Sequence, residues 1–265
     1  MSTSIANQSV EQLGGPLSVL VRQKQDHIEL DRLLNALDAA TGAEQDDVLR
    51  RIYRLVFPHA FAEEAVLWPV IRRALPEGQQ LTLEVEREHQ EVNELVTRLE
   101  AMDSGSAGRR EVLDRLTEVL REDVRDEEDE LFPRLQQKLD ERELRRLGVL
   151  WEMVRRTAPT RAHPIVARRP PGNVLAALPL SAIDRLRDAL GAAAQRMPGG
   201  PGQVTERVDV TLRRAARRVE RLPIMRTGED PSTRSAAQDS PARWVPIAIV
   251  GLTLAVLVVA RRARR

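Results

Sequence analysis

The chain has 265 residues, of which 42% are hydrophobic and 31% are charged, and it contains no cysteine. This length allows one domain with a substantial core plus additional segments. The lack of cysteine excludes disulfides, thiolate chemistry and cysteine-ligated zinc or iron–sulfur centres, so only His, Asp and Glu could hold a transition metal. The formal net charge of +1 combines −10 over residues 1–160 with +11 over residues 161–265.

Residues 16–156 are predicted to be helical almost throughout, because apolar residues recur at helical spacing between short Gly-, Pro- and Ser-containing breaks. The predicted helices cover residues 16–40, 43–74, 79–102, 109–139 and, shorter, 142–156. Pro69 and Pro133 fall inside two of them, so a kink is expected after Trp68 and after Phe132. The four long segments with short connections predict an all-α, antiparallel four-helix bundle.

Each long helix turns one or two potential metal ligands towards its apolar face. His59 is followed one turn later by Glu63, and Asp123 is followed at the same spacing by Glu127. The candidate ligands are His27, His59, Glu63, His89, Asp123 and Glu127. Their surroundings are repeated along the chain: DHIEL (26–30) corresponds to EHQEV (88–92), and HAFAEEAVLWP (59–69) corresponds to DVRDEEDELFP (123–133).

Three inward carboxylates and three imidazoles would be costly to bury without a counter-charge, and no inward Lys or Arg is predicted. Two cations bridged by carboxylates would satisfy every member of the set, and imidazole with carboxylate suits iron, manganese or zinc. Six protein ligands for two metals leave open positions for oxygen, nitric oxide or peroxide. We interpret the remaining acidic residues here as a solvated face and His163 as an uninvolved linker residue. The acidic residues meant are Glu64, Glu128, Asp129 and Glu130.

Residues 16–156 resemble a hemerythrin-like domain of the HHE cation-binding family, whose motif is a His on helix 1, HxxxE on helix 2, a His on helix 3 and HxxxE on helix 4. The LWP and LFP tails after the two acidic pairs are also typical of that family. The resemblance implies a four-helix bundle with a non-haem di-iron centre, in which Glu63 and Glu127 are the bridging candidates. The departure is Asp123, which offers a shorter, negatively charged ligand where the family has His.

The resemblance implies a protein that binds or senses oxygen or nitric oxide, or that handles iron. A second interpretation is an enzyme that decomposes peroxide, because an open di-iron site can perform redox chemistry. A third is a metal-free helical scaffold that recruits partners to a membrane. The sequence leaves the choice among these functions open.

Residues 157–243 are predicted to be a Pro/Arg-rich linker that carries basic amphipathic helices. Residues 157–173 show no core-forming pattern, 181–196 and 203–222 can form short helices, and 226–243 has a composition typical of disorder. In residues 203–222 a narrow apolar stripe lies beside six arginines. This pattern fits anionic lipid headgroups, and a nucleic-acid contact is the rival interpretation that we favour less.

Residues 244–260, WVPIAIVGLTLAVLVVA, form an uncharged stretch between arginines. Its length is near the lower limit for a transmembrane helix, and Trp244 suits a membrane interface, so we expect a membrane anchor. The terminal arginines by themselves favour a cytoplasmic C-terminus. Residues 1–20 lack the features of a secretory signal, however, and we therefore expect the bundle on the cytoplasmic side.

Overall fold

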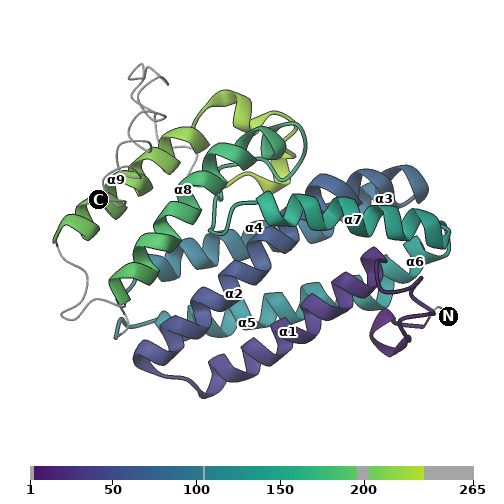
Figure 1. Cartoon of the computed structure of the whole chain (residues 1–265), viewed down its shortest axis with the longest axis horizontal. Coiled ribbons are helices and arrows are strands. Elements are labelled where there is room, and N and C mark those ends of the chain that lie inside the picture. Colours follow the sequence, from purple (N-terminus) through teal and green to yellow (C-terminus); the bar gives the residue numbers. More distant parts are fainter. Residues whose placement is uncertain (1–2, 104, 196–202, 236–265) are drawn as a thin grey trace, which may run out of the picture.

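The computed structural model describes residues 3–103, 105–195 and 203–235, and within these ranges every regular element is a helix. Four long helices run back and forth beside one another in a bundle (Figure 1). They are α1 (Val19–Ala39), α2 (Gly42–Ala62), α4 (Gly78–Glu100) and α5 (Arg109–Asp126). The all-α prediction is therefore confirmed.

Two of the expected helices are each divided by a wider turn. Residues Glu63–Leu67 and Glu127–Leu131 are π-helical, and α3 (Trp68–Ala74) and α6 (Phe132–Gln136) continue from them. Pro69 and Pro133 thus lie in the first turn of a new helix, where proline is tolerated. A kink was expected directly before each proline, after Trp68 and after Phe132. The irregularity instead is a π turn in the five residues before Trp68 and before Phe132, and π turns of this kind are frequent at functional sites.

The bundle core is divided into two apolar clusters. On the four long helices and their continuations, the first cluster includes Val21, Ala62, Val85 and Leu131. The second cluster includes Leu30, Phe57, Val92 and Leu120. The chain meets the first cluster before the second on α1 and α4, and in the opposite order on the other two helices, which is the pattern of an antiparallel bundle. His27, His59, His89, Asp123 and Glu127 lie between the clusters in sequence, and Glu63 directly follows Ala62 of the first cluster.

Helix α7 (Glu141–Thr157) packs along α1 and α2. A capping box starts it: the Asp140 side chain accepts from the Glu143 backbone N–H, and the Glu143 side chain accepts from that of Asp140. Gly148 allows close packing, because a Cβ there would lie 2.0 Å from the Leu17 carbonyl oxygen. This approach accompanies the complete burial of Trp151 against the bundle.

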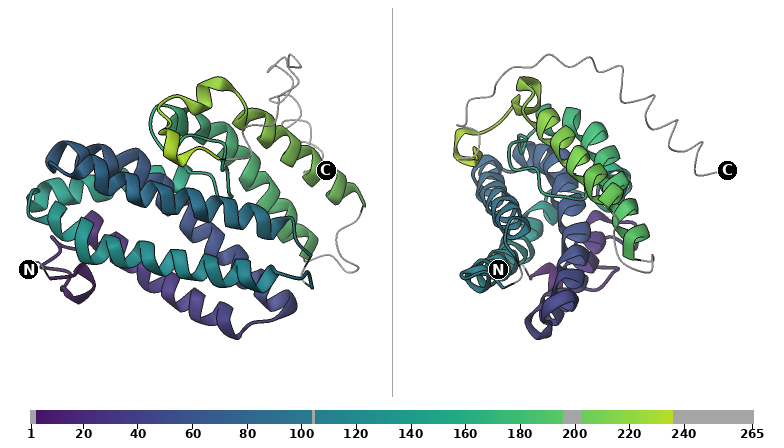
Figure 2. Two further views of the ribbon diagram at one scale, coloured as in Figure 1. Left: turned by 180° about the vertical axis from the view of Figure 1, so that it is seen from behind. Right: turned by 90° about the vertical axis from the view of Figure 1, so that its left-hand side faces the viewer.

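The segment expected to be a linker instead packs against the bundle as a helical cap. Helices α8 (Gly172–Gln195) and α9 (Gln203–Glu220) lie side by side on one flank (Figure 2). They share a small apolar cluster that includes Leu180, Ile183 and Ala216. Helix α8 begins earlier than expected, at Gly172. Residues 231–233 form a short 3-10 helix within the stretch that had the composition of disorder, and residues 223–226 form another at its start.

The basic helix is confirmed as α9, but the second half of its apolar stripe faces protein, while Val204 and Val208 are exposed. Leu212, Ala215 and Val219 pack in the cluster shared with α8, and the arginines of α9 remain exposed. Within the described ranges, no helix is long and apolar enough to cross a membrane. The expected anchor at residues 244–260 lies outside those ranges.

Candidate metal centre

The fold brings all six candidate ligands to the level between the two apolar clusters. Ligand atoms of His27, His59, Glu63 and Glu127 lie within 4.8 Å of one another, as do those of His89, Asp123 and Glu127. The first group draws on the α1–α2 half and the second on the α4–α5 half, and Glu127 belongs to both. The arrangement provides two neighbouring positions for cations with a carboxylate between them.

Both glutamates of the HxxxE-type spacing point between the imidazoles. Glu63 places Oε1 3.1 Å from Nε2 of His59 and Oε2 3.7 Å from Nε2 of His89, so its two oxygens face the two halves. Glu127 Oε2 lies 3.3 Å from Nε2 of His27. Asp123 Oδ1 lies 3.6 Å from Nε2 of His89. A carboxylate that faces both halves has the geometry needed to bridge two metals.

The donor atoms that meet here lack other partners. Both carboxylate oxygens of Glu63 and of Glu127, Oδ1 of Asp123 and Nε2 of His27 are buried and form no hydrogen bond with the described residues. Leaving buried carboxylate oxygens in this state is costly, because each loses its hydration without compensation. Cations coordinated by these oxygens and imidazoles would remove the cost, so the residues present fit a pair of metal ions.

The opposite nitrogen of each imidazole is held by a carboxylate. His27 Nδ1 lies 3.0 Å from Glu128, His59 Nδ1 lies 3.0 Å from Asp26, and His89 Nδ1 lies 3.1 Å from Glu64. A carboxylate that accepts from Nδ1–H fixes the tautomer and leaves Nε2 free for a metal. These are the contacts that metal-binding histidines typically make.

The interpretation of Glu64 and Glu128 as a solvated face was therefore wrong. Glu64 is 1% exposed, and the side chain of Glu128 is 14% exposed. The π turns widen the helix where each Glu–Glu pair lies, and both members of a pair are used inside the bundle. Asp129 and Glu130 are exposed, as expected. The sequence-based prediction did not include the contacts of Glu64 and Glu128 with the histidine Nδ1 atoms. The duplication of the Glu–Glu pair in both motifs was the one indication of such a role in the sequence.

Aromatic rings cover the three imidazoles. Trp68 stacks on His89 at 6.2 Å between ring centroids, and Phe132 stacks on His27 at 6.3 Å. Trp151 of α7 meets His59 edge-on at 5.3 Å. Trp68 thus contacts the same imidazole, His89, that Glu64 holds. Phe132 likewise contacts the imidazole of His27, which Glu128 holds. Ring packing of this kind limits the rotation of the imidazoles and excludes water.

Asp123 has an environment that a histidine would also fit. In the other half, Asp26 precedes His27 and holds His59; in this half, Glu88 precedes His89 and interacts with Asp123. Burial raises the pKa of Glu88 to about 7, and nearby acidic groups contribute to the rise. Burial and the charge of Glu127 raise the pKa of Asp123. Two carboxyl groups stand here where the pseudo-symmetric half has a carboxylate and an imidazole.

The site attracts positive charge strongly. Burial lowers the pKa of His27, but the contacts with Glu127 and Glu128 outweigh burial and raise it to about 9. For His89 the charge of Asp123 and the hydrogen bond with Glu64 likewise outweigh burial, and the pKa rises to about 10. The carboxylates therefore favour either imidazolium protons or bound cations at this level of the bundle.

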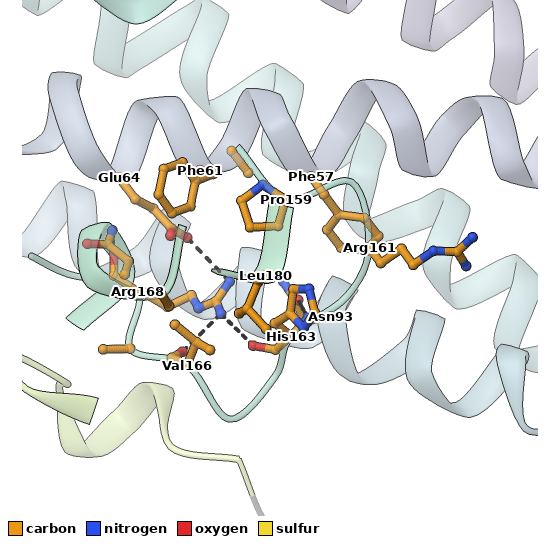
Figure 3. Close-up of a pocket in the computed structure, with 14 residues that line it drawn as sticks. Phe57, Phe61, Glu64, Asn93, Pro159, Arg161, His163, Val166, Arg168 and Leu180 are labelled. Atoms are coloured by element: carbon orange, nitrogen blue, oxygen red, sulfur yellow. Dashed lines mark hydrogen bonds and ion pairs between the residues drawn. The ribbon is translucent and has the colours of Figure 1, made fainter. Parts of the chain in front are cut away.

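The cap reaches the edge of the centre. Arg168 donates to the backbone oxygens of His163 and Val166 and places Nη1 3.8 Å from Glu64, as the close-up in Figure 3 shows. These residues line a small cavity of about 30 Å³ between the bundle and the cap. The cap thus lies beside the carboxylate that orients His89.

His163 is buried and central to this cap, contrary to the expectation of an uninvolved linker residue. Its Nε2 lies 3.0 Å from Asp184 of α8, and its Nδ1 lies 2.7 Å from Glu220 of α9. Its backbone N–H donates to Asn93, whose amide donates to the carbonyl oxygen of His89. The linker therefore connects α8, α9 and α4 through one residue.

Comparison with known proteins identifies the domain that carries this centre. Residues 19–135 match the family described as the Hemerythrin HHE cation binding domain. The chain is similar to an uncharacterized hemerythrin-like protein of Schizosaccharomyces pombe (strain 972), at 30% identity over 133 residues. That similarity covers 50% of this chain and 66% of the relative, just under two thirds of its length. No solved structure matches the chain at a significant level.

Proposed function

Because residues 19–135 are a hemerythrin HHE cation-binding domain, we propose that this protein holds two iron ions in its bundle and uses them to bind or sense oxygen or nitric oxide, or to handle iron. The observation that carries the proposal is the set of buried carboxylate oxygens that face three imidazoles and have no other partner among the described residues. Iron in such a site would supply a redox-active cation with open coordination positions. Manganese and zinc fit the same ligands.

Different residues would ligate each ion, orient the ligand imidazoles and exclude water. His27 and His59 would hold one ion, and His89 and Asp123 would hold the other. Glu127 belongs to both groups of ligands, and Glu63 would be available to both ions because its second oxygen faces His89. The Nδ1 partners keep each imidazole in the tautomer that a metal needs, and the aromatic rings exclude bulk water. An open position in a water-poor site favours binding of a small uncharged ligand.

The aspartate ligand distinguishes the two positions. Asp123 is shorter than histidine and carries a charge, so the ion in the α4–α5 half receives more negative charge and a less extended ligand. We expect this ion to be bound less tightly than its partner, and to be more stable in an oxidised state. The two positions therefore differ in affinity in this protein.

Metal analysis combined with an optical spectrum tests the proposal, and peroxide separates a binder from an enzyme. The binding function predicts a stable spectral change on addition of oxygen or nitric oxide, without turnover. Rapid loss of peroxide that His59→Ala abolishes and Glu130→Gln leaves intact would instead establish the enzymatic interpretation. Glu130 is the matched control, because its side chain is exposed and bound to Arg134.

The proposal includes attachment to a membrane through residues 244–260, with the bundle on the cytoplasmic side. The uncharged sequence between arginines supports this location, and the exposed arginines of α9 fit an anionic membrane surface nearby. The full chain is expected in the membrane fraction after a carbonate wash, whereas a chain ended at Ser235 is expected in the supernatant. Equal partitioning of the two would contradict the anchor.

A further inference from the structure

An arginine-lined groove lies on the flank of the bundle where α2, the end of α7 and α8 meet. Its volume is about 590 Å³, which is large enough for a small metabolite. Four arginines and two carboxylates contribute to its wall. These residues are Arg54, Arg155, Arg156, Arg185, Glu152 and Asp188.

Both carboxylates of the groove already form ion pairs with arginines. Glu152 is paired with Arg22 as well as with Arg155 and Arg156. Asp188 lies 2.8 Å from Arg161 and 3.6 Å from Arg54. The positive charge of the groove therefore exceeds its negative charge.

Arg185 has more N–H donors than it uses in hydrogen bonds with neighbouring residues. It donates to the Ser181 hydroxyl and to the Arg156 backbone oxygen. Among the described residues no carboxylate forms an ion pair with it. The side chain of Arg156 is 76% exposed beside it. Two guanidinium groups that line the same groove and retain free N–H donors match the oxygens of a phosphate group.

Arg155 connects the groove with the metal centre. Its Nη1 lies 3.3 Å from Oδ2 of Asp26, the same oxygen that lies 3.0 Å from Nδ1 of His59. Its guanidinium also lies over the ring of Trp151, at 5.2 Å, and that ring meets His59 edge-on. Arg155 is thus two contacts away from a candidate metal ligand, and an anion bound to Arg155 is three contacts away.

We propose that this groove binds the phosphate group of a phosphorylated compound, and that the bound anion is coupled to the metal centre through Arg155, Asp26 and His59. An anion in the groove competes with Asp26 for Arg155, which leaves more negative charge on Asp26 for the His59 Nδ1–H. The change strengthens His59 as a ligand. Coupling of this kind is reciprocal: the phosphate alters metal affinity, and the metal alters phosphate affinity by the same factor.

The first experiment measures binding of inorganic phosphate to the full chain with its metal, by equilibrium dialysis. The variant Arg156→Gln/Arg185→Gln is compared with Arg32→Gln/Arg110→Gln, which removes two exposed arginines elsewhere. The groove variant is expected to bind phosphate at least about tenfold more weakly, while the control binds as the unmodified chain does. Equal phosphate affinity of the two variants would overturn the proposal. This is also the result expected if phosphate binds directly to the metal and not in the groove.

The second experiment measures the rate of metal release to a chelator with and without saturating phosphate. Only this coupling step rests on the proposed metal function. Phosphate is expected to slow release about fivefold in the unmodified chain and to have no effect in the groove variant. Phosphate binding that depends on the groove but leaves metal release unchanged would overturn the coupling, whereas a chain without metal would contradict the proposed function and not the anion site.

A lipid headgroup and a soluble metabolite can both supply the phosphate. Sedimentation of the chain ended at Ser235 with phosphatidylglycerol vesicles, compared with phosphatidylcholine vesicles, separates these sources. A preference for phosphatidylglycerol that the groove variant loses would identify a lipid as the source. A preference that the groove variant keeps belongs to the exposed arginines of α9. Binding of free phosphate in the groove without a preference that the groove variant loses would identify a soluble compound, and absence of both would contradict the site.

Discussion

Glu64 Oε1 lies 3.1 Å from Nδ1 of His89, which joins the second residue of an acidic pair to an imidazole on another helix. The relationship recurs in the duplicated motif, where Glu128 lies 3.0 Å from Nδ1 of His27. The first member of each pair points between the imidazoles, and the second orients the imidazole of the opposite half. Each half of the bundle therefore supports the ligands of the other.

This cross-support predicts that Glu64→Gln and Glu128→Gln weaken metal binding although neither residue belongs to the six proposed ligands. Losing a carboxylate that holds a ligand imidazole typically costs about 10- to 100-fold in metal affinity. Competition with a chromophoric chelator would measure the loss. Glu130→Gln in the same π turn as Glu128 is the control, since Glu130 is exposed. The same affinity in all three variants would show that the Nδ1 contacts do not tune a metal.

Asp123→His is predicted to strengthen the position in the α4–α5 half. The new imidazole could place Nδ1 against Glu88, as His59 does against Asp26 in the other half. Metal at this position should bind about tenfold more tightly or more, because an oriented imidazole replaces a short carboxylate. Asp123→Ala should lose that ion. If metal content and spectrum are unchanged in both variants, residue 123 is not a ligand.

The cap is predicted to lose stability as the pH rises. Burial lowers the pKa of His163, but Asp184 and Glu220 outweigh it and raise the pKa to about 9. Because this folded-state value lies above the ordinary 6.5, the stabilisation is fully present below pH 6.5 and is lost as the pH rises through about 9. Amide exchange in α8 and α9, corrected for the intrinsic pH dependence of exchange, should therefore accelerate between these values.

His163→Gln provides the comparison for that measurement. The variant should show faster exchange in α8 and α9 already at neutral pH, and the acceleration between pH 6.5 and 9 should disappear. Exchange in α1 and α5 serves as an internal control, because the hydrogen bonds of His163 reach α4, α8 and α9 instead. An unchanged pH dependence in the variant would assign the effect to other groups.

The effect of metal removal and of ligand replacement on thermal stability distinguishes a metal-binding bundle from a metal-free scaffold. Stripping the metal should lower the midpoint of thermal unfolding, because the carboxylates of Glu63 and Glu127 then lose their cations inside the bundle. Replacing His27, His59 and His89 together by Leu should abolish metal binding and leave those carboxylates without partners. A metal-free scaffold would instead gain stability from the same three substitutions.

The fold and the inward residues could be predicted because both follow from local periodicity. The spacing of Glu63 after His59, one helical turn, fixes which face carries the carboxylate, and the four apolar stripes fix the bundle. The partners of Nδ1 could not be read in this way. Glu64 is adjacent to Glu63, and an ideal α-helix would turn it about 100° away. The π turn that brings both into use depends on tertiary packing.

The cap was missed for a related reason. His163 lies in a Pro/Arg-rich stretch without apolar periodicity, so nothing local indicates that it becomes buried. Its burial depends on Asp184 and Glu220, which are distant in the sequence and lie on two different helices. Long-range ion pairs of this kind leave no periodic signal, and a strongly charged segment therefore resembles a linker until its partners are placed.

The metal content of the purified full chain from iron-replete cells, measured together with its absorption spectrum, tests the two-iron centre most directly. We expect about two iron ions per chain and oxo-bridge charge-transfer absorption in the near ultraviolet. We also expect that Glu63→Ala, which removes a shared carboxylate, lowers the iron content and abolishes that absorption. A folded chain that contains no metal under these conditions would contradict the central claim.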